Sequence, residues 1–239
     1  MKDIWKDYEP GSFFDELMFA KHQPRAFSFK LLEYLRCMEK EAFTQRVQES
    51  EVEMLERGIT FTIYSDAGNI DRAWPFDIIP RAIPKSEWER TEKGLKQRIH
   101  ALNQFIQDIY NDGNIINDGI IPADVVYQSK GYRKECHGMT PAHGVWANIC
   151  GSDLVRDHDG TLYVLEDNLR VPSGVAYMLE NRKTTKRVLP ELFKLLNISP
   201  VDAYPEHLAE MLASLRPDLT NPTMALLTPG IYNSAYFEH

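Results

Sequence analysis

The chain has 239 residues, of which 43% are hydrophobic, and a formal charge of −8 at pH 7. The negative charge argues against a nucleic-acid-binding surface, and no segment approaches the 18 consecutive apolar residues of a membrane span. The acidic amino terminus lacks the pattern of a signal peptide, and the three cysteines are an odd and sparse set. We therefore expect a cytoplasmic protein with reduced thiols.

The first quarter of the chain is predicted to be mostly helical. A short helix is expected over Phe13–Ala20, and Ser28 opens a longer helical run that stops at Gly58. Ile59–Tyr64 is rich in β-branched and aromatic residues, which predicts a strand, and Ile70–Trp74 can return as its partner.

The strongest predicted helix runs from about Glu87 to Tyr110. Ser86 with Glu89 three residues later forms a capping-box pattern at its start. Apolar residues recur at helical spacing along it, and we interpret this stripe as core packing rather than as a partner groove. The stripe consists of Trp88, Leu95, Ile99, Leu102, Phe105, Ile106 and Ile109.

Residues 113–144 are predicted to be mostly loop, with a short helix or strand over Pro122–Tyr127. Their cysteines and histidines lack the paired spacing that indicates a zinc site. We expect instead a surface loop over the active site, in which His137 or His143 contacts nucleotide or substrate. The residues concerned are Cys136, His137, His143 and Cys150.

A hairpin is predicted over residues 151–168, with its turn at Asp157–Gly160. If Asp157 pairs with Gly160, Asp153 lies opposite Val164 and diagonal to Glu166. Glu166 and Asn168 are two residues apart and share the same face. Two carboxylates and one amide oxygen suit Mg²⁺ or Mn²⁺. The alternative is that these are solvent-facing polar positions on an edge hairpin.

The loop after the hairpin, LRVPSG, precedes a predicted helix over Val175–Glu180. The backbone amides around Ser173-Gly174 could cradle an anion there, or the loop is an ordinary connector. A basic patch follows, which is either a solvated helix face or a partner of that anion site. Its members are Arg170, Arg182, Lys183, Lys186 and Arg187.

Helical patterning returns over Thr184–Leu196 and Glu206–Leu215. Thr223–Thr228 is then predicted to be a strand, followed by a turn at Pro229-Gly230 and the start of a helix. A strand, a turn and a helix are the opening of a parallel α/β unit. A parallel strand needs neighbours, so we expect the sequence to be the front portion of a longer protein.

Three stretches carry a resemblance to a known family. They are RAWPFDIIPRAIPKSEWERTEKGLKQRIHALNQFIQDIY, LVRDHDGTLYVLEDNLRVPSGVAYMLENR and LLTPGIYNSAYFEH. The sequence resembles the circularly permuted ATP-grasp type 2 family, relatives of glutathionylspermidine synthase, over the amino-terminal portion of its members. The resemblance implies an α+β, ATP-grasp-like fold with an antiparallel sheet, packed helices and the start of a parallel α/β unit. We expect residues 1–200 to hold the metal-binding hairpin and residues 201–239 to begin an incomplete second domain.

The resemblance implies an ATP-dependent carboxylate–amine ligase that acts through an acyl phosphate, on small-molecule or peptide substrates. In the family an Asp and a Glu-x-Asn pair hold Mg²⁺ on ATP, which implies Asp153, Glu166 and Asn168 here. Arg170 and Ser173 are the expected catalytic and phosphate-contacting residues, with Gly174 beside them. Relatives place an Arg two residues before the Asp, where this sequence has Gly151.

The lysines and the loop that clamp the nucleotide are expected later than residue 239, so this polypeptide alone is expected to lack them. Two alternatives are a non-catalytic truncated module and a metal-dependent phosphohydrolase. A homo-oligomer is possible in each case.

Overall fold

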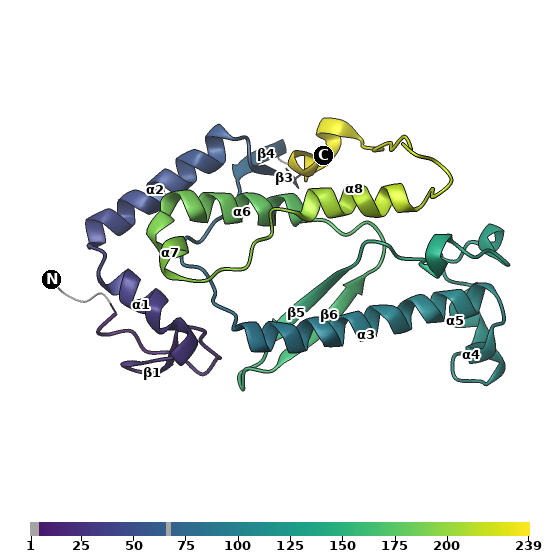
Figure 1. The fold of residues 1–239 in the computed structure, drawn as a ribbon, viewed down its shortest axis with the longest axis horizontal. Coiled ribbons are helices and arrows are strands. Elements are labelled where there is room, and N and C mark those ends of the chain that lie inside the picture. Colours follow the sequence, from purple (N-terminus) through teal and green to yellow (C-terminus); the bar gives the residue numbers. More distant parts are fainter. Residues whose placement is uncertain (1–4, 66–67) are drawn as a thin grey trace.

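The structure is a computed structural model that describes residues 5–65 and 68–239. The strands are β1 (Met18–Ala20), β2 (Gln23–Pro24), β3 (Thr60–Ser65), β4 (Gly68–Ala73), β5 (Gly151–Arg156) and β6 (Leu162–Asn168). The helices are α1 (Phe29–Arg36), α2 (Lys40–Glu56), α3 (Lys85–Tyr110), α4 (Asn114–Asn117), α5 (Ala123–Tyr127), α6 (Val175–Val188), α7 (Pro190–Leu195) and α8 (Tyr204–Ser214). Within the described residues the strands form three separate antiparallel pairs, β1–β2, β3–β4 and β5–β6. Figure 1 shows α2, α6 and α8 along one side of the molecule and α3 with the β5–β6 hairpin along the other.

The main core lies where α1, α7 and the end of α6 meet the amino-terminal segment. Leu31, Leu32 and Leu35 project from one face of α1 and are almost completely buried, as expected for apolar residues at helical spacing. They pack with residues from the amino-terminal segment, with Ile78, and with the end of α6 and the start of α7. The cluster contains Trp5, Met18, Leu31, Leu32, Leu35, Ile78, Val188, Leu189 and Leu192.

A second, smaller core joins the end of α2 to the start of α6. Met54, Ile59 and Tyr177 are buried together. The Tyr177 ring stacks on Trp74 with the ring centres 4.1 Å apart, and its hydroxyl donates to the Thr60 carbonyl at 2.9 Å. These contacts fix the amino-terminal half of α6, which follows the predicted anion loop.

The helix predicted over Phe13–Ala20 is wrong, because part of this segment is strand β1. The Asp15 carboxylate accepts hydrogen bonds from the backbone N–H groups of Leu17 and Met18, both at 2.7 Å. A side chain that binds its own backbone in this way favours a turn over a helix. The longer helical run is divided into α1 and α2, and its predicted terminator, Gly58, has a left-handed φ of 65°.

Helix α3 is present almost as predicted, but two details are wrong. It begins at Lys85 after Pro84, so Ser86 lies inside the helix and no side chain caps it. Its apolar stripe is not core: of the α3 residues only Asn103 and Tyr110 are buried, and Trp88 is 47% exposed. The reason is that α3 lies against a hairpin whose strands have six and seven residues, too short to cover a helix about 39 Å long.

The carboxyl-terminal segment lacks the predicted parallel α/β opening. Residues 223–228 form no strand, and two short 3₁₀ turns, Gly230–Tyr232 and Tyr236–Glu238, replace the predicted helix. A strand needs a neighbour to pair its backbone groups, and none lies beside this segment in the part of the chain that the structure describes. Leu226 and Leu227 are accordingly exposed.

The described residues of this chain contain no helix that is both long enough and apolar enough to cross a membrane.

Candidate metal and phosphate site

The β5–β6 hairpin forms around a turn whose geometry requires glycine. Gly160 has a φ of 90° and its N–H donates to the Asp157 carbonyl at 2.9 Å. A Cβ atom at this position would lie 2.4 Å from the Phe14 ring. The Asp157 N–H donates to the Thr161 carbonyl at 2.9 Å, so Thr161 belongs to the turn and the connection is one residue longer than predicted.

The strand register differs from the prediction in two places. Arg156 pairs with Leu162 rather than with Thr161, and an irregularity between Asp153 and Leu154 leaves Leu165 as an extra residue on β6. A single one-residue slip would move Glu166 to the other face of the hairpin. Because there are two offsets, Asp153 returns to the same face as Glu166 and lies directly opposite it.

The three predicted metal-binding side chains therefore lie on one open face. Asp153 and Glu166 are exposed cross-strand partners, and Cβ atoms of such partners are about 4.5–5.5 Å apart. The Asn168 amide donates to the Glu166 carboxylate at 3.1 Å. The apolar neighbours Val155 and Tyr163 are exposed beside them.

The opposite face of the hairpin is fixed against α3 by Asp167, a residue that the sequence analysis did not single out. Its carboxylate accepts a hydrogen bond from the Ser152 hydroxyl at 2.7 Å and pairs with Arg98. Burial alone would raise the pKa of Asp167, but the hydrogen bonds from Ser152 and Arg98 outweigh it and hold this pKa below its ordinary value. Side chains alternate between the two faces of a strand, so the sequence of β6 could have shown that Asp167 faces the side opposite to Glu166 and Asn168.

A second anchor joins the hairpin to the amino-terminal segment, and it too was missed. The Arg156 side chain is 6% exposed and lies 3.1 Å from Glu16 and 2.7 Å from Glu87. It also lies over the Phe14 ring. No local sequence signal indicates this cluster, because Arg156 lies 140 residues from Glu16 in the chain.

The predicted anion cradle after β6 holds a carboxylate from this chain. The N–H groups of Gly174 and Ala176 donate to Glu238, at 2.6 and 3.2 Å. Gly174 has a φ of 106° and precedes α6. The exposed Val171 has a φ of 51°, an uncommon conformation for a β-branched residue.

Arg170 and Ser173 are exposed, and neither side chain has a hydrogen-bond partner within the described residues. Their predicted catalytic and phosphate-contacting roles stay predictions. Gly151 has a structural explanation: a Cβ atom there would lie 3.0 Å from Pro172 and 3.8 Å from Asn168. The local backbone therefore leaves little room for a larger side chain, such as the arginine that the resemblance led us to expect here.

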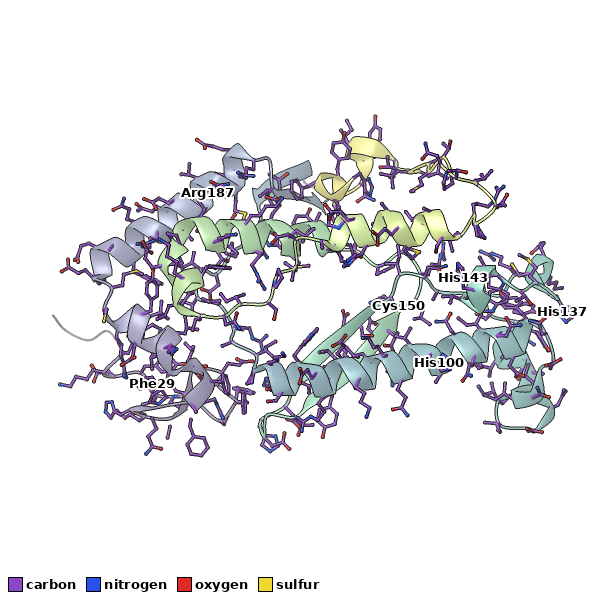
Figure 2. All side chains as sticks on the ribbon, viewed as in Figure 1. Phe29, His100, His137, His143, Cys150 and Arg187 are labelled. Carbon is purple, nitrogen blue, oxygen red and sulfur yellow. The ribbon has the colours of Figure 1, made fainter. Side chains whose placement is uncertain are left out.

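Of the cysteines and histidines of the middle segment, Cys150 directly precedes β5 and lines a cavity with His143 and Ser152, whereas His137 lies away from the hairpin. Figure 2 shows His137 at the far end of the molecule and Cys150 near the hairpin. His143 lies 2.9 Å from the Ser214 carbonyl through its Nε2 atom. Among the described residues, no three His, Cys, Asp or Glu side chains converge to hold a metal, so the candidate hairpin set depends on the Asn168 amide for its third ligand.

A family comparison gives this geometry its context. The family model of the circularly permuted ATP-grasp type 2 proteins matches residues 80–239. The chain belongs to this family. The match contains the whole hairpin, the anion loop and Glu238. The predicted family is thereby confirmed.

Several relatives of this ATP-grasp protein are longer than it. An uncharacterized Synechocystis protein is 48% identical over 235 residues, which is 98% of this chain and 49% of the relative. A Mycobacterium tuberculosis protein is 44% identical over 186 residues, 77% of this chain and 33% of the relative. A Frankia casuarinae protein, whose name places it provisionally among glutamate–cysteine ligases, is 37% identical over 97% of this chain and 27% of its own length. The chain thus spans about half or less of these relatives.

ATP-grasp proteins use ATP with a divalent metal, so the fit of the hairpin can be examined. Asp153, Glu166 and Asn168 would offer hard oxygen ligands from adjacent positions on an open face. Such a set leaves coordination positions for water and phosphate, as Mg²⁺ prefers. The donor chemistry fits the metal that the family implies.

Proposed function

We propose that this chain provides the metal-binding part of an ATP-dependent carboxylate–amine ligase. The observation that carries the proposal is the direct cross-strand pairing of Asp153 with Glu166 beside Asn168. The family membership and the ligase name of the Frankia relative support the same reaction class. The substrates would be a small-molecule or peptide carboxylate and an amine.

The chemistry requires charge neutralisation more than it requires a side-chain nucleophile. Phosphoryl transfer from ATP to a carboxylate builds negative charge on oxygen atoms, and a bound Mg²⁺ or Mn²⁺ would supply the opposing charge. Asp153, Glu166 and Asn168 would hold that cation. Arg170 and Ser173 would contact phosphate from the following loop, and an amine would then attack the acyl phosphate, forming an amide and releasing inorganic phosphate.

The other hairpin residues would hold the metal ligands in position. Asp167, held by Ser152 and Arg98, binds one face to α3 and leaves the other face open. A ligand set held by rigid neighbours loses less entropy when a metal binds. The nucleotide-clamping lysines are proposed to lie outside residues 1–239, in the part of the longer relatives that this chain does not cover.

Metal binding by the 239-residue chain is the first test. Mn²⁺ titrations followed by water-proton relaxation should show a saturable site that Glu166→Gln weakens about tenfold or more, since a charged ligand is lost. Glu89→Gln is the matched control, because Glu89 is exposed on α3 and pairs only with Lys85 at 3.7 Å among the described residues. Equal Mn²⁺ affinity in the two variants would contradict the proposal that Glu166 is a metal ligand.

The reaction class is tested by trapping the acyl phosphate with hydroxylamine, in a protein of this family that turns over ATP. Hydroxylamine-dependent ADP release indicates an acyl phosphate and hence a ligase. Phosphate release from ATP without any acceptor, abolished by Glu166→Gln, would instead indicate a phosphohydrolase. Tight binding of Mg²⁺–ATP by this chain alone would contradict the proposal that the clamp lies elsewhere.

A further inference from the structure

A basic cavity lies away from the hairpin face, between the carboxyl-terminal half of α6, α7 and the segment that follows α7. Its volume is about 410 Å³. Four cations of α6 line it, at positions that lie on one side of a helix. They are Arg182, Lys183, Lys186 and Arg187, and Figure 2 marks Arg187 where α6 runs beside α2.

The rest of the wall is mainly apolar. Phe193 of α7 and Ile198 are half-buried and face the cavity with Pro200. The Arg182 guanidinium lies 6.0 Å from the centre of the Phe193 ring and donates to the Ser199 carbonyl at 2.9 Å. Arg182 is therefore held at the wall before any ligand arrives.

The cations around the cavity outnumber the carboxylates within the described residues. Glu53 pairs with Arg57 and Arg187, and Glu180 pairs with Arg57 and Lys183. Asp202 is the third carboxylate and lines the cavity. Five cations face these three carboxylates, which leaves an excess of two positive charges. The cations are Arg57, Arg182, Lys183, Lys186 and Arg187. The Lys186 side chain makes no ion pair or hydrogen bond with any other described residue.

We propose that this cavity binds the dianionic phosphate group of a small molecule whose apolar body lies against Phe193 and Ile198. The local excess of two charges matches a dianion, in a chain whose formal charge is −8. Arginine and lysine together suit phosphate oxygens. Basic residues near a helix carboxyl terminus also interact favourably with the helix dipole, but this does not explain a hollow with an apolar wall. The inference does not depend on the ligase proposal.

The test uses phenyl phosphate, which combines a dianion with an apolar ring. Isothermal titration of the 239-residue chain should show saturable binding that Lys186→Gln weakens about tenfold, or 1.4 kcal/mol. Lys85→Gln is the control, since the Lys85 side chain is 85% exposed on α3. Phenol should not bind. Binding should weaken at pH 5, where the phosphate loses its second charge.

Two results would overturn the proposal: no saturable binding of phenyl phosphate, or equal affinity in Lys186→Gln and Lys85→Gln. Arg182→Lys provides a second variant that keeps the charge but loses the planar contact with Phe193, and it should weaken phenyl phosphate more than inorganic phosphate. AMP distinguishes the source of the phosphate. AMP binding that depends on Lys186 assigns a nucleotide, and phenyl phosphate binding without AMP binding assigns a smaller phosphate ester.

Discussion

The Glu238 carboxylate accepts a hydrogen bond from the backbone N–H of Gly174 at 2.6 Å, across 64 positions of sequence. The first N–H groups of a helix have no partner inside the helix and lie at the positive end of its dipole. Glu238 therefore both satisfies the start of α6 and fastens the carboxyl-terminal segment to it. The same loop connects to β6, so this contact bears on the geometry of the candidate site.

Removing this carboxylate should loosen the start of α6. Glu238→Ala is expected to lower the free energy of unfolding by about 1–2 kcal/mol, the usual cost of a lost helix cap. Amide hydrogen exchange at residues 174–178 should become faster. Glu210→Ala, at an exposed position of α8, should leave that exchange unchanged. Unaltered exchange in Glu238→Ala would mean that this contact does not form in solution.

Arg156 should be among the most costly positions to neutralise. Arg156→Met leaves Glu16 and Glu87 without their shared buried cation, and breaking a buried ion pair in this way costs about 3–5 kcal/mol. Urea unfolding measures the loss. Arg81→Gln removes another partner of Glu16 at a side chain that is 71% exposed, and it should cost about 1 kcal/mol or less. Similar losses in the two variants would contradict the role given to Arg156.

These anchors show what the sequence pattern could and could not predict. The shared face of Glu166 and Asn168 follows from the two-residue period of a strand, and the family motifs select the same residues. The turn packs against Phe14, which is far away in the chain, so local sequence could not predict its length. The bulge at Leu165 was also missed, because no residue type at that position signals an extra residue in the strand. The strand predicted over Thr223–Thr228 shows the same limit, since strand propensity needs a pairing partner to take effect.

The position of α3 was predicted well because its apolar residues recur at helical spacing over a long stretch. The burial of those residues, however, was predicted wrongly. An apolar stripe indicates a face that can pack, and the partner that covers it is decided by tertiary structure. In this chain Trp88 and Ile99 instead line a cavity of about 580 Å³. No local sequence pattern predicts the contact between Glu238 and Gly174, because the two residues are 64 positions apart and many other acidic residues could have filled the same role.

The pKa of Asp167 gives a pH-dependent prediction. Its folded-state pKa lies below the ordinary value of about 3.9, so its stabilisation is present above that value and is lost as pH falls through the folded-state pKa. Asp167→Asn should therefore be less stable than the native chain at pH 7, and the difference should shrink toward pH 3. Urea midpoints across this range measure it. A difference that stays constant with pH would exclude the ion pair with Arg98 as its cause.

The bulge at Leu165 provides the sharpest test of the site geometry. Deleting this residue should close the bulge and keep Asp153 opposite Glu166 on the open face, because Val164 and Glu166 then become consecutive partners of Leu154 and Asp153. The deletion should therefore keep Mn²⁺ affinity close to that of the native chain, with the helices still folded by circular dichroism. Leu165→Ala is the matched control, because the side chain is 70% exposed and the backbone keeps its extra residue. If the deletion variant binds Mn²⁺ much more weakly than Leu165→Ala does, the pairing of Asp153 with Glu166 is not enough to create the metal site.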